Sequence, residues 1–384
     1  MSGTTTPEPT TAAPYAAGAI ATPTDAMIVA TPVEPDPAKL EAFVGRMVSD
    51  MGAAMSGALI ITGTKLGLYK ALQDGGPATS SQLAARVDAA ERYVREWLSA
   101  QAASGYVDYD AETGQFSLSP EQAMVFANED SPVYLAPAYE VIASGYIDEP
   151  KVSDAFRTGK GVGWHEHHEC LFRGTERFFR PGYRAHLVQE WLPALDGVVA
   201  KLQAGAKVAD IGCGAGASTI VMAQAYPNSH FTGFDYHEAS IERAREAARE
   251  AGSPANLEFA VATAKETPGE GYDLVACFDC LHDMGDPVGA ARRVRAMLSA
   301  NGTFMIVEPF AKDSLAENIN PVGRLYYSAS TMICTPGSLA QEVGLALGAQ
   351  AGEARLTEVL RDAGFTRVRR AAETPFNLVI EARP

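Results

Sequence analysis

The chain has 384 residues, of which 47% are hydrophobic and 20% are charged, as is typical of a globular protein with a sizeable core. Asp and Glu number 47 against 31 Lys and Arg, which gives a formal net charge of −16. Binding to nucleic acid needs clustered cations, so this balance argues against a nucleic-acid partner. The apolar run GALIITG (57–63) is far shorter than the roughly 20 residues of a membrane span, so no membrane partner is expected.

Residues 1–37 are rich in Thr, Pro and Ala and contain no Lys or Arg. A secretory signal would need a basic start and a continuous apolar run, and this segment has neither. We therefore expect a disordered tail. The five cysteines are scattered and odd in number, which favours reduced thiols in a cytoplasmic protein over a disulfide framework.

Residues 38–125 are predicted to form helices followed by a β-hairpin. In the first helix apolar side chains recur every four positions, at Phe43, Met47, Met51 and Met55, a stripe typical of core or dimer packing. Further elements are predicted in chain order: a helix around 63–72, a helix capped by Thr79 or Ser80, a helix at 91–107 and a hairpin at 106–119.

Three helices and a hairpin in this order are typical of a winged-helix domain. Such a domain can bind DNA, but the acids of the presumed recognition stretch at 80–97 cancel most of its arginines. We therefore expect a dimerisation domain and a homodimer formed through the N-terminal helices. A ligand-sensing winged-helix regulator is the alternative. Residues 126–195 are predicted to be a helical linker that roofs a pocket.

Residues 196–384 alternate strands and helices, which predicts an α/β fold with a Rossmann-like, doubly wound sheet. The last two predicted strands are joined by only a couple of residues, so they should pair antiparallel at the sheet edge. Seven strands are predicted in all, at 208–212, 230–235, 257–262, 272–278, 303–308, 366–373 and 376–384.

The stretch VADIGCGAGAS (208–218) is a glycine-rich loop between a strand and a helix. Gly212 permits a tight turn, and Gly214 lets backbone amides approach a ligand closely. The glycine spacing also fits a dinucleotide fingerprint, so a NAD-dependent oxidoreductase is an alternative. However, Asp210 lies inside the strand, where a carboxylate suits a cationic ligand and repels a pyrophosphate. Asp235 ends the second strand, where it can bind the hydroxyls of a ribose.

With Asp210, Gly212 and Gly214 as D-x-G-x-G and a C-terminal hairpin, the chain resembles class I S-adenosylmethionine-dependent methyltransferases that carry an N-terminal winged-helix domain. The resemblance implies that Asp210 and the loop amides face the methionine part of S-adenosyl-L-methionine and that Asp235 faces the ribose. Family members often have Gly-Asp-Ala at the adenine, where this chain has Ala-Thr-Ala. The expected cofactor-binding residues are Asp210, Gly212, Cys213, Gly214, Asp235, Tyr236, Thr263, Ala264 and Phe278.

The stretch CFDCLHDMGDP (277–287) resembles one in small-molecule O-methyltransferases of the plant and antibiotic-pathway kind. The resemblance implies that His282 removes the proton of an acceptor hydroxyl and that Glu308 orients it. Attack on a sulfonium methyl requires this proton to leave, and imidazole has a suitable pKa near 6.5. We therefore expect methyl transfer to a small-molecule hydroxyl. Thiol or amine acceptors on the same scaffold are alternatives.

The stretch GWHEHHEC (163–170) concentrates three of the seven histidines. His165 has the helix-face spacing to His168 or Glu169 that a divalent cation could use. Methyl transfer from a sulfonium does not require a metal, and a flexible GKGVG precedes the stretch, so we interpret it as a lid and expect no metal. The expected substrate-binding residues are Trp164, His165, His167, Tyr326 and Tyr327, although the two tyrosines could equally be core.

Overall fold

The structure, a computed structural model, describes residues 34–384. The tail predicted at 1–37 therefore lies, up to residue 33, outside the described residues. The chain divides into a unit that ends at Ser49 and a unit from Asp50 to Pro384. Among residues 34–384 no single helix is long and apolar enough to cross a membrane, and only the first two helices, bent by 62°, meet the criteria of length and composition as a pair.

The N-terminal region contains the predicted helices followed by the predicted hairpin. Gly67, at φ 68°, separates the first two helices, and Thr79 caps the third through a capping box with Gln82. A core gathers around Tyr69 and Trp97, whose rings meet edge to face. The elements are α1 (Pro37–Lys65), α2 (Leu68–Gly75), α3 (Ser80–Arg86), α4 (Glu91–Ala103), β1 (Asp108–Asp110), β2 (Gln115–Ser117) and α5 (Pro120–Phe126).

The apolar stripe of α1 is exposed in the single chain. Phe43 and Met47 are 55% and 41% exposed, and Met51 and Met55 are 64% and 76% exposed. Core packing therefore does not cover the stripe within one copy of the chain.

Helices connect this region to the sheet. Gly159, at φ 70°, ends the long helix that precedes the histidine-rich stretch, and His168 caps the next helix by accepting from the backbone N–H of Cys170 at 3.3 Å. The elements are α6 (Ala138–Thr158), the 3₁₀ turn η1 (Trp164–Glu166), α7 (Glu169–Gly182), the π-helix η2 (Tyr183–Trp191) and α8 (Val198–Ala204).

The seven predicted strands form one sheet in the order β5-β4-β3-β6-β7-β9-β8. The first five strands in sequence are parallel, and β9 pairs antiparallel with β7 and β8, as the short link predicts. The strands are β3 (Lys207–Ile211), β4 (His230–Asp235), β5 (Leu257–Val261), β6 (Tyr272–Phe278), β7 (Leu298–Pro309), β8 (Arg367–Glu373) and β9 (Asn377–Arg383). The Rossmann-like fold class is confirmed.

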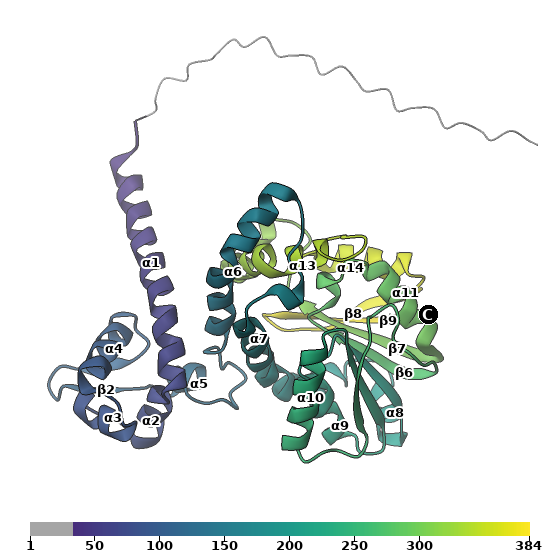
Figure 1. The fold of residues 1–384 in the computed structure, drawn as a ribbon, viewed down its shortest axis with the longest axis horizontal. Coiled ribbons are helices and arrows are strands. Elements are labelled where there is room, and N and C mark those ends of the chain that lie inside the picture. Colours follow the sequence, from purple (N-terminus) through teal and green to yellow (C-terminus); the bar gives the residue numbers. More distant parts are fainter. Residues whose placement is uncertain (1–33) are drawn as a thin grey trace, which may run out of the picture. The chain divides into compact units, whose positions relative to one another are not determined.

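Helices follow the strands, as Figure 1 shows. They are α9 (Ala217–Ala225), α10 (Glu238–Glu250), η3 (Leu281–Asp283), α11 (Pro287–Met297), η4 (Ala316–Asn318), α12 (Pro321–Ala329), η5 (Ser330–Cys334), α13 (Thr335–Leu339) and α14 (Gly352–Asp362).

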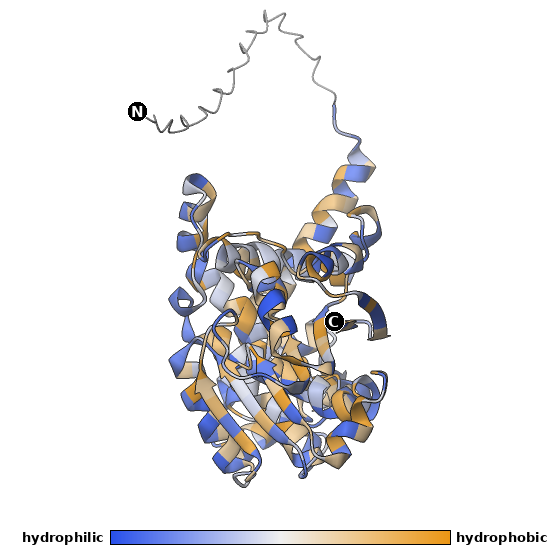
Figure 2. Ribbon diagram, turned by 90° about the vertical axis from the view of Figure 1, so that its right-hand side faces the viewer, coloured by the Kyte–Doolittle hydropathy of each residue, from blue (hydrophilic) through white to orange (hydrophobic). Residues whose placement is uncertain are grey.

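The central strands β3, β6 and β7 bury apolar side chains on both faces, which fits a sheet covered by helices on both sides. Val208 packs with α8, α9 and η2, whereas the next residue, Ala209, packs with α11 and α14 on the opposite face. The hydrophobic colour of the central strands in Figure 2 reflects this double burial. The chain reverses its direction of travel across the sheet between β3 and β6, and such a switch point is where open α/β sheets bind ligands.

Candidate functional site

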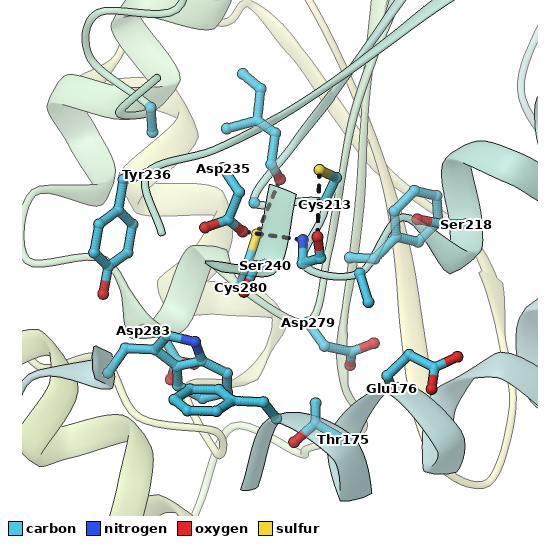
Figure 3. Close-up of a pocket in the computed structure, with 18 of the residues that line it drawn as sticks. Thr175, Glu176, Cys213, Ser218, Asp235, Tyr236, Ser240, Asp279, Cys280 and Asp283 are labelled. Atoms are coloured by element: carbon cyan, nitrogen blue, oxygen red, sulfur yellow. Dashed lines mark hydrogen bonds between the residues drawn. The ribbon is translucent and has the colours of Figure 1, made fainter. Parts of the chain in front are cut away.

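A cavity of about 370 Å³ lies at the carboxyl ends of β3, β4, β5 and β6. Its floor is formed by the glycine loop, by Asp235 and Tyr236 after β4, and by the segment that follows β6. Its roof is formed by Trp164 and by side chains of α7, among them Thr175 and Glu176 (Figure 3). The site thus brings together segments separated by more than a hundred residues of chain.

The glycine loop folds tightly because its backbone amides bind the neighbouring strand. The N–H groups of Gly212 and Cys213 donate to the carbonyl of Phe234 at 2.8 and 3.0 Å, and that of Gly214 donates to Oδ2 of Asp235 at 3.0 Å. Gly212 and Gly214 have φ values of 70° and 54°, in the left-handed region that favours glycine. A Cβ at Gly212 would lie 2.7 Å from Sγ of Cys280, so this position also has no room for a side chain.

Asp210 lies buried beneath the loop and does not line the cavity itself. Its Oδ2 accepts hydrogen bonds from the hydroxyls of Ser218 and Thr219, each at 2.7 Å. Its Oδ1 is buried and has no hydrogen-bond partner among the described residues. Burial raises the pKa of Asp210 to about 6, although the two hydroxyls oppose this rise. The chain therefore holds a carboxylate with one unsatisfied oxygen next to the cavity.

Asp235 lines the cavity, and both of its oxygens accept backbone hydrogen bonds, from Gly214 and, at 2.8 Å, from His237. Each oxygen retains a lone pair for a ligand hydroxyl. Burial raises the pKa of Asp235. Thr263 also lines the cavity, but its hydroxyl donates to Glu266 at 2.9 Å and is therefore already engaged. The remaining predicted cofactor-binding residues at the cavity are Gly212, Cys213, Gly214, Tyr236, Ala264 and Phe278.

Asp279 lines the cavity and was not predicted from the sequence. It follows β6 with a φ of 51°, uncommon for a residue other than glycine. Its carboxylate accepts hydrogen bonds from the Tyr183 hydroxyl and the Asn377 side-chain amide, both at 3.2 Å. Burial, reinforced by the charge of Glu308, raises the pKa of Asp279 to about 8. The sequence signal for it was a carboxylate at the end of a buried strand.

The structure brings His282 and Glu308 together, as predicted. Nδ1 of His282 is hydrogen-bonded to Oε2 of Glu308, and Oε1 of Glu308 accepts from the backbone N–H of Leu281 at 2.9 Å. Nε2 of His282 lies 3.2 Å from Oδ1 of Asp283. Burial alone would lower the pKa of His282, but the charges of Glu308 and Asp283 outweigh it and raise the pKa well above its usual value. His282 is buried behind Asp283, which lines the cavity.

Of the histidine-rich stretch GWHEHHEC (163–170), only Trp164 lines the cavity. Trp164 lines the cavity and meets Phe172 edge to face, with ring centroids 5.3 Å apart. His165 is exposed. His167 is buried, with Nδ1 3.1 Å from Oδ2 of Asp148, and its Nε2 has no partner among the described residues. His168 is occupied as the cap of α7.

Tyr326 and Tyr327 do not line this cavity. Tyr326 is buried and donates its hydroxyl to the carbonyl of Phe376 at 3.0 Å, which is a core arrangement. Tyr327 is half-buried. Sequence reasoning instead missed the aromatic residues of the roof, since an amphipathic helix does not reveal what its apolar face covers. Those that line the cavity are Phe172, Phe179 and Tyr183.

Two family models match different parts of the chain. Residues 202–364 match the family model described as a methyltransferase domain, and residues 54–128 match the Rv2258c-like winged HTH domain. The 27-O-demethylrifamycin SV methyltransferase of Amycolatopsis mediterranei is 33% identical over 131 residues, which cover 32% of this chain and 48% of that protein. The chain spans less than half of the length of the first curated relatives that it matches.

Solved structures match over most of the chain. A putative O-methyltransferase from Nostoc punctiforme has a TM-score of 0.65 at 21% identity, covering 91% of this chain and all of that one. Human N-acetylserotonin methyltransferase, solved in complex with S-adenosylmethionine, also has a TM-score of 0.65, at 17% identity, with 92% and 99% of the two chains covered. At these identities the likeness shows the fold.

The two loop glycines give a matched pair of substitutions. Gly214→Ala should lower the free energy of unfolding by about 1 kcal/mol, because only the left-handed backbone is strained. Gly212→Ala should cost about 1–3 kcal/mol more, because its Cβ also meets Cys280. Urea unfolding measures both losses, and equal losses would show that the approach of Cys280 does not constrain the loop.

Proposed function

Because the chain joins a methyltransferase domain to an N-terminal winged helix-turn-helix domain, as the sequence predicts, we propose that it transfers a methyl group from S-adenosyl-L-methionine to a hydroxyl of a small molecule. The observation that carries the proposal is the cavity at the strand ends. There Asp235 and the glycine loop form one wall of the cavity. The His282–Glu308 pair lies behind a second wall, which includes Asp283.

The charges at the cavity suit a cationic ligand. Its lining includes the carboxyl groups of Glu176, Asp235 and Asp283, with Arg243 as the one arginine or lysine among the lining residues. The unsatisfied Oδ1 of Asp210 adds a further acceptor beneath the loop. A sulfonium and an ammonium group fit such surroundings, whereas the pyrophosphate of NAD would be repelled. This disfavours the oxidoreductase alternative.

The chain's own residues have separate tasks. S-adenosylmethionine, when bound, supplies a methyl group activated by its sulfonium charge. Asp235 binds and orients the cofactor beside the wall that the glycine loop forms, and Trp164 with α7 excludes water from above. Glu308 holds Nδ1 of His282, which leaves Nε2 to take the proton of the acceptor hydroxyl after His282 has released its own. A thiol or amine acceptor would depend less on this histidine.

The winged helix gives little support to a DNA-binding regulator. Arg92 and Arg95 on α4 form ion pairs with Glu96 and Glu91 of the same helix, at 2.6 Å in each case. Arg86 donates to backbone carbonyls, including that of Gly76 at 2.7 Å. The arginines that could meet phosphates are therefore already partnered within the domain, in agreement with the acidic composition.

We infer that the exposed stripe of α1 packs against a second copy of the chain. Met51 and Met55 lie among a row of exposed apolar side chains, and a helix face of this kind is stabilised when it leaves water. Homodimerisation through the N-terminal helices accounts for the stripe without a partner of another kind.

Isothermal titration calorimetry can test which cofactor the chain binds. We expect S-adenosylmethionine to bind and NADH not to bind. The affinity should fall several-fold between about pH 7 and pH 5, because Asp210, with its pKa raised to about 6, loses its negative charge over this range. Asp210→Asn should weaken binding at pH 7 and flatten this dependence. Binding of NADH, or a pH dependence in Asp210→Asn as steep as that of the parent chain, would contradict the assignment.

Measurement of the methyl-transfer rate can test whether His282 is the general base. With labelled S-adenosylmethionine and a panel of phenols, thiols and carboxylic acids, we expect label in a phenolic product. His282→Ala should lower the rate of that transfer by about 100-fold or more while cofactor affinity stays nearly intact. His230→Ala, an exposed histidine at the start of β4, is the matched control. Undiminished turnover of a hydroxyl acceptor by His282→Ala would remove this residue from the mechanism.

Light scattering after gel filtration tests the dimer. The double change Met51→Glu and Met55→Glu should halve the measured mass, because burying two carboxylates in an apolar interface is costly. Tyr93→Glu, which changes an exposed aromatic residue on α4 instead of α1, should leave the mass unchanged. A monomeric parent chain, or a double variant that stays dimeric, would reject the interface.

A further inference from the structure

The cavity is small for a site that must hold two ligands. Its volume of about 370 Å³ lies near the lower end of the roughly 300–1,000 Å³ that sites for one small molecule span. Methyl transfer, the proposed function on which this inference rests, needs a cofactor and an acceptor in the site together. The floor is formed by strand ends and by the glycine loop, which hydrogen bonds hold to the sheet, so the roof is the part that can move.

The roof turn, residues 163–168, is the part of the roof that belongs to no long helix. It lies between α6 and α7 and contains η1, from which Trp164 reaches the cavity lining. Within the turn, Oε2 of Glu166 accepts a hydrogen bond from the N–H of Gly163 at 2.7 Å. The roof turn is therefore closed on itself and can move as one unit.

The chain just before the roof turn is fixed to the end of α13. The N–H of Val162 donates to the carbonyl of Pro336 at 3.0 Å. A Cβ at Gly161 would lie 2.0 Å from the backbone nitrogen of Ala340, so only glycine allows the chain to approach this closely. Movement of the roof turn can therefore begin only after Val162, at Gly163.

A single buried carboxylate holds the other end of the roof turn. Oδ2 of Asp148, on α6, accepts a hydrogen bond from the backbone N–H of His168 at 2.8 Å and lies 3.1 Å from Nδ1 of His167. Its Oδ1 accepts from Nζ of Lys151 at 2.8 Å, and the same ammonium group donates to the carbonyl of Glu166. Asp148 is 1% exposed, so water does not compete for these bonds. Three consecutive residues of the turn are thus tied to one side chain, directly or through Lys151.

Asp148 keeps its negative charge, which strengthens these bonds. Burial alone would raise the pKa of Asp148, but the hydrogen bonds from its three donors outweigh burial and lower the pKa. Hydrogen bonds to a charged acceptor are stronger than those between neutral groups. The contacts of Asp148 therefore favour the closed position of the roof turn.

One atom of the roof turn favours the opposite state. Nε2 of His167 is buried and has no hydrogen-bond partner among residues 34–384. Burial lowers the pKa of His167, which keeps the ring neutral. Water would supply the missing partner if the turn lifted, and a buried polar atom without a partner is costly. The closed position is thus opposed at His167 and depends on the bonds of Asp148.

We propose that the roof turn is a lid that lifts at Gly163 to admit the acceptor and release the products, and that Asp148 is the latch that holds this lid closed. Asp148 is a positioning residue, because it acts through His167 and His168 and does not line the cavity. When the lid lifts, Trp164 leaves the cavity and the room above the bound cofactor increases. When the lid closes, it excludes water from the transfer.

Hydrogen exchange of the full chain without ligand tests the latch. In Asp148→Asn the amides of the roof turn should exchange about 10-fold faster or more, because the charged acceptor of the turn is lost. Asp154→Asn makes the same change at an exposed position of α6 and should leave their exchange at the parent rate. Exchange in Asp148→Asn at the parent rate, or an equal rise in Asp154→Asn, would overturn the latch.

Lys151→Met provides a second variant, which decides the matter if Asp148→Asn does not fold. It changes a half-exposed side chain and leaves the buried carboxylate in place. Exchange in the roof turn should rise by a smaller factor than in Asp148→Asn. Urea unfolding measures whether each variant is folded, and a folded Lys151→Met with parent exchange rates would also overturn the latch.

Stopped-flow binding of S-adenosylhomocysteine tests whether the latch controls access to the cavity. A latch that acts on the empty and the occupied site limits entry and exit alike. Asp148→Asn should therefore raise the association and dissociation rates together by about 10-fold, with Kd changed by less than about 3-fold. A residue that only supports the structure of the site would instead weaken Kd without faster association.

Two results would separate this lid from the proposed function. Unchanged rates in folded Asp148→Asn, or a rise in the dissociation rate alone, would overturn the lid while the proposed methyl transfer stands. A parent chain that binds neither S-adenosylmethionine nor S-adenosylhomocysteine would overturn the proposed function, and hydrogen exchange would then decide the latch alone.

Discussion

The hydrogen bonds between the glycine loop and β4 determine the rest of the site. By donating to Phe234 and Asp235, the amides of residues 212–214 turn the chain at the end of β3 and start α9 at the switch point of the sheet. The same contacts fix the Asp235 carboxylate at the cavity wall.

Several carboxyl groups lie at the site, and the three described next each accept hydrogen bonds from neighbouring groups. Asp210 is held by two hydroxyls, Asp279 by a tyrosine and an amide, and Glu308 by an imidazole and backbone amides. Buried acids are costly unless they are partnered or neutralised. Their concentration at one end of the sheet favours a cationic group such as a sulfonium or an ammonium, in agreement with the proposed cofactor.

The sequence predicted the sheet well because its signals are local. Strands such as 230–235 and 272–278 are short apolar runs bounded by turn residues, and the D-x-G-x-G turn follows from backbone requirements. It predicted the His282–Glu308 pair only through a family resemblance. It could not place Asp279 or the aromatic roof, because these depend on how distant segments pack. His165 and His168 show the opposite case. Their spacing would suit one cation if they lay on one helix, but His165 lies in the turn η1 and His168 caps α7.

The negative charge of the chain also has a kinetic consequence. A net charge of −16, with further carboxyl groups lining one cavity, produces a field that extends into solvent beyond any contact distance. Such a field raises the rate at which a cation encounters the cavity, and it repels anions that would otherwise compete. Added salt screens this attraction over about 10 Å at 0.1 M, so ligand capture here is governed by ionic strength before any hydrogen bond has formed.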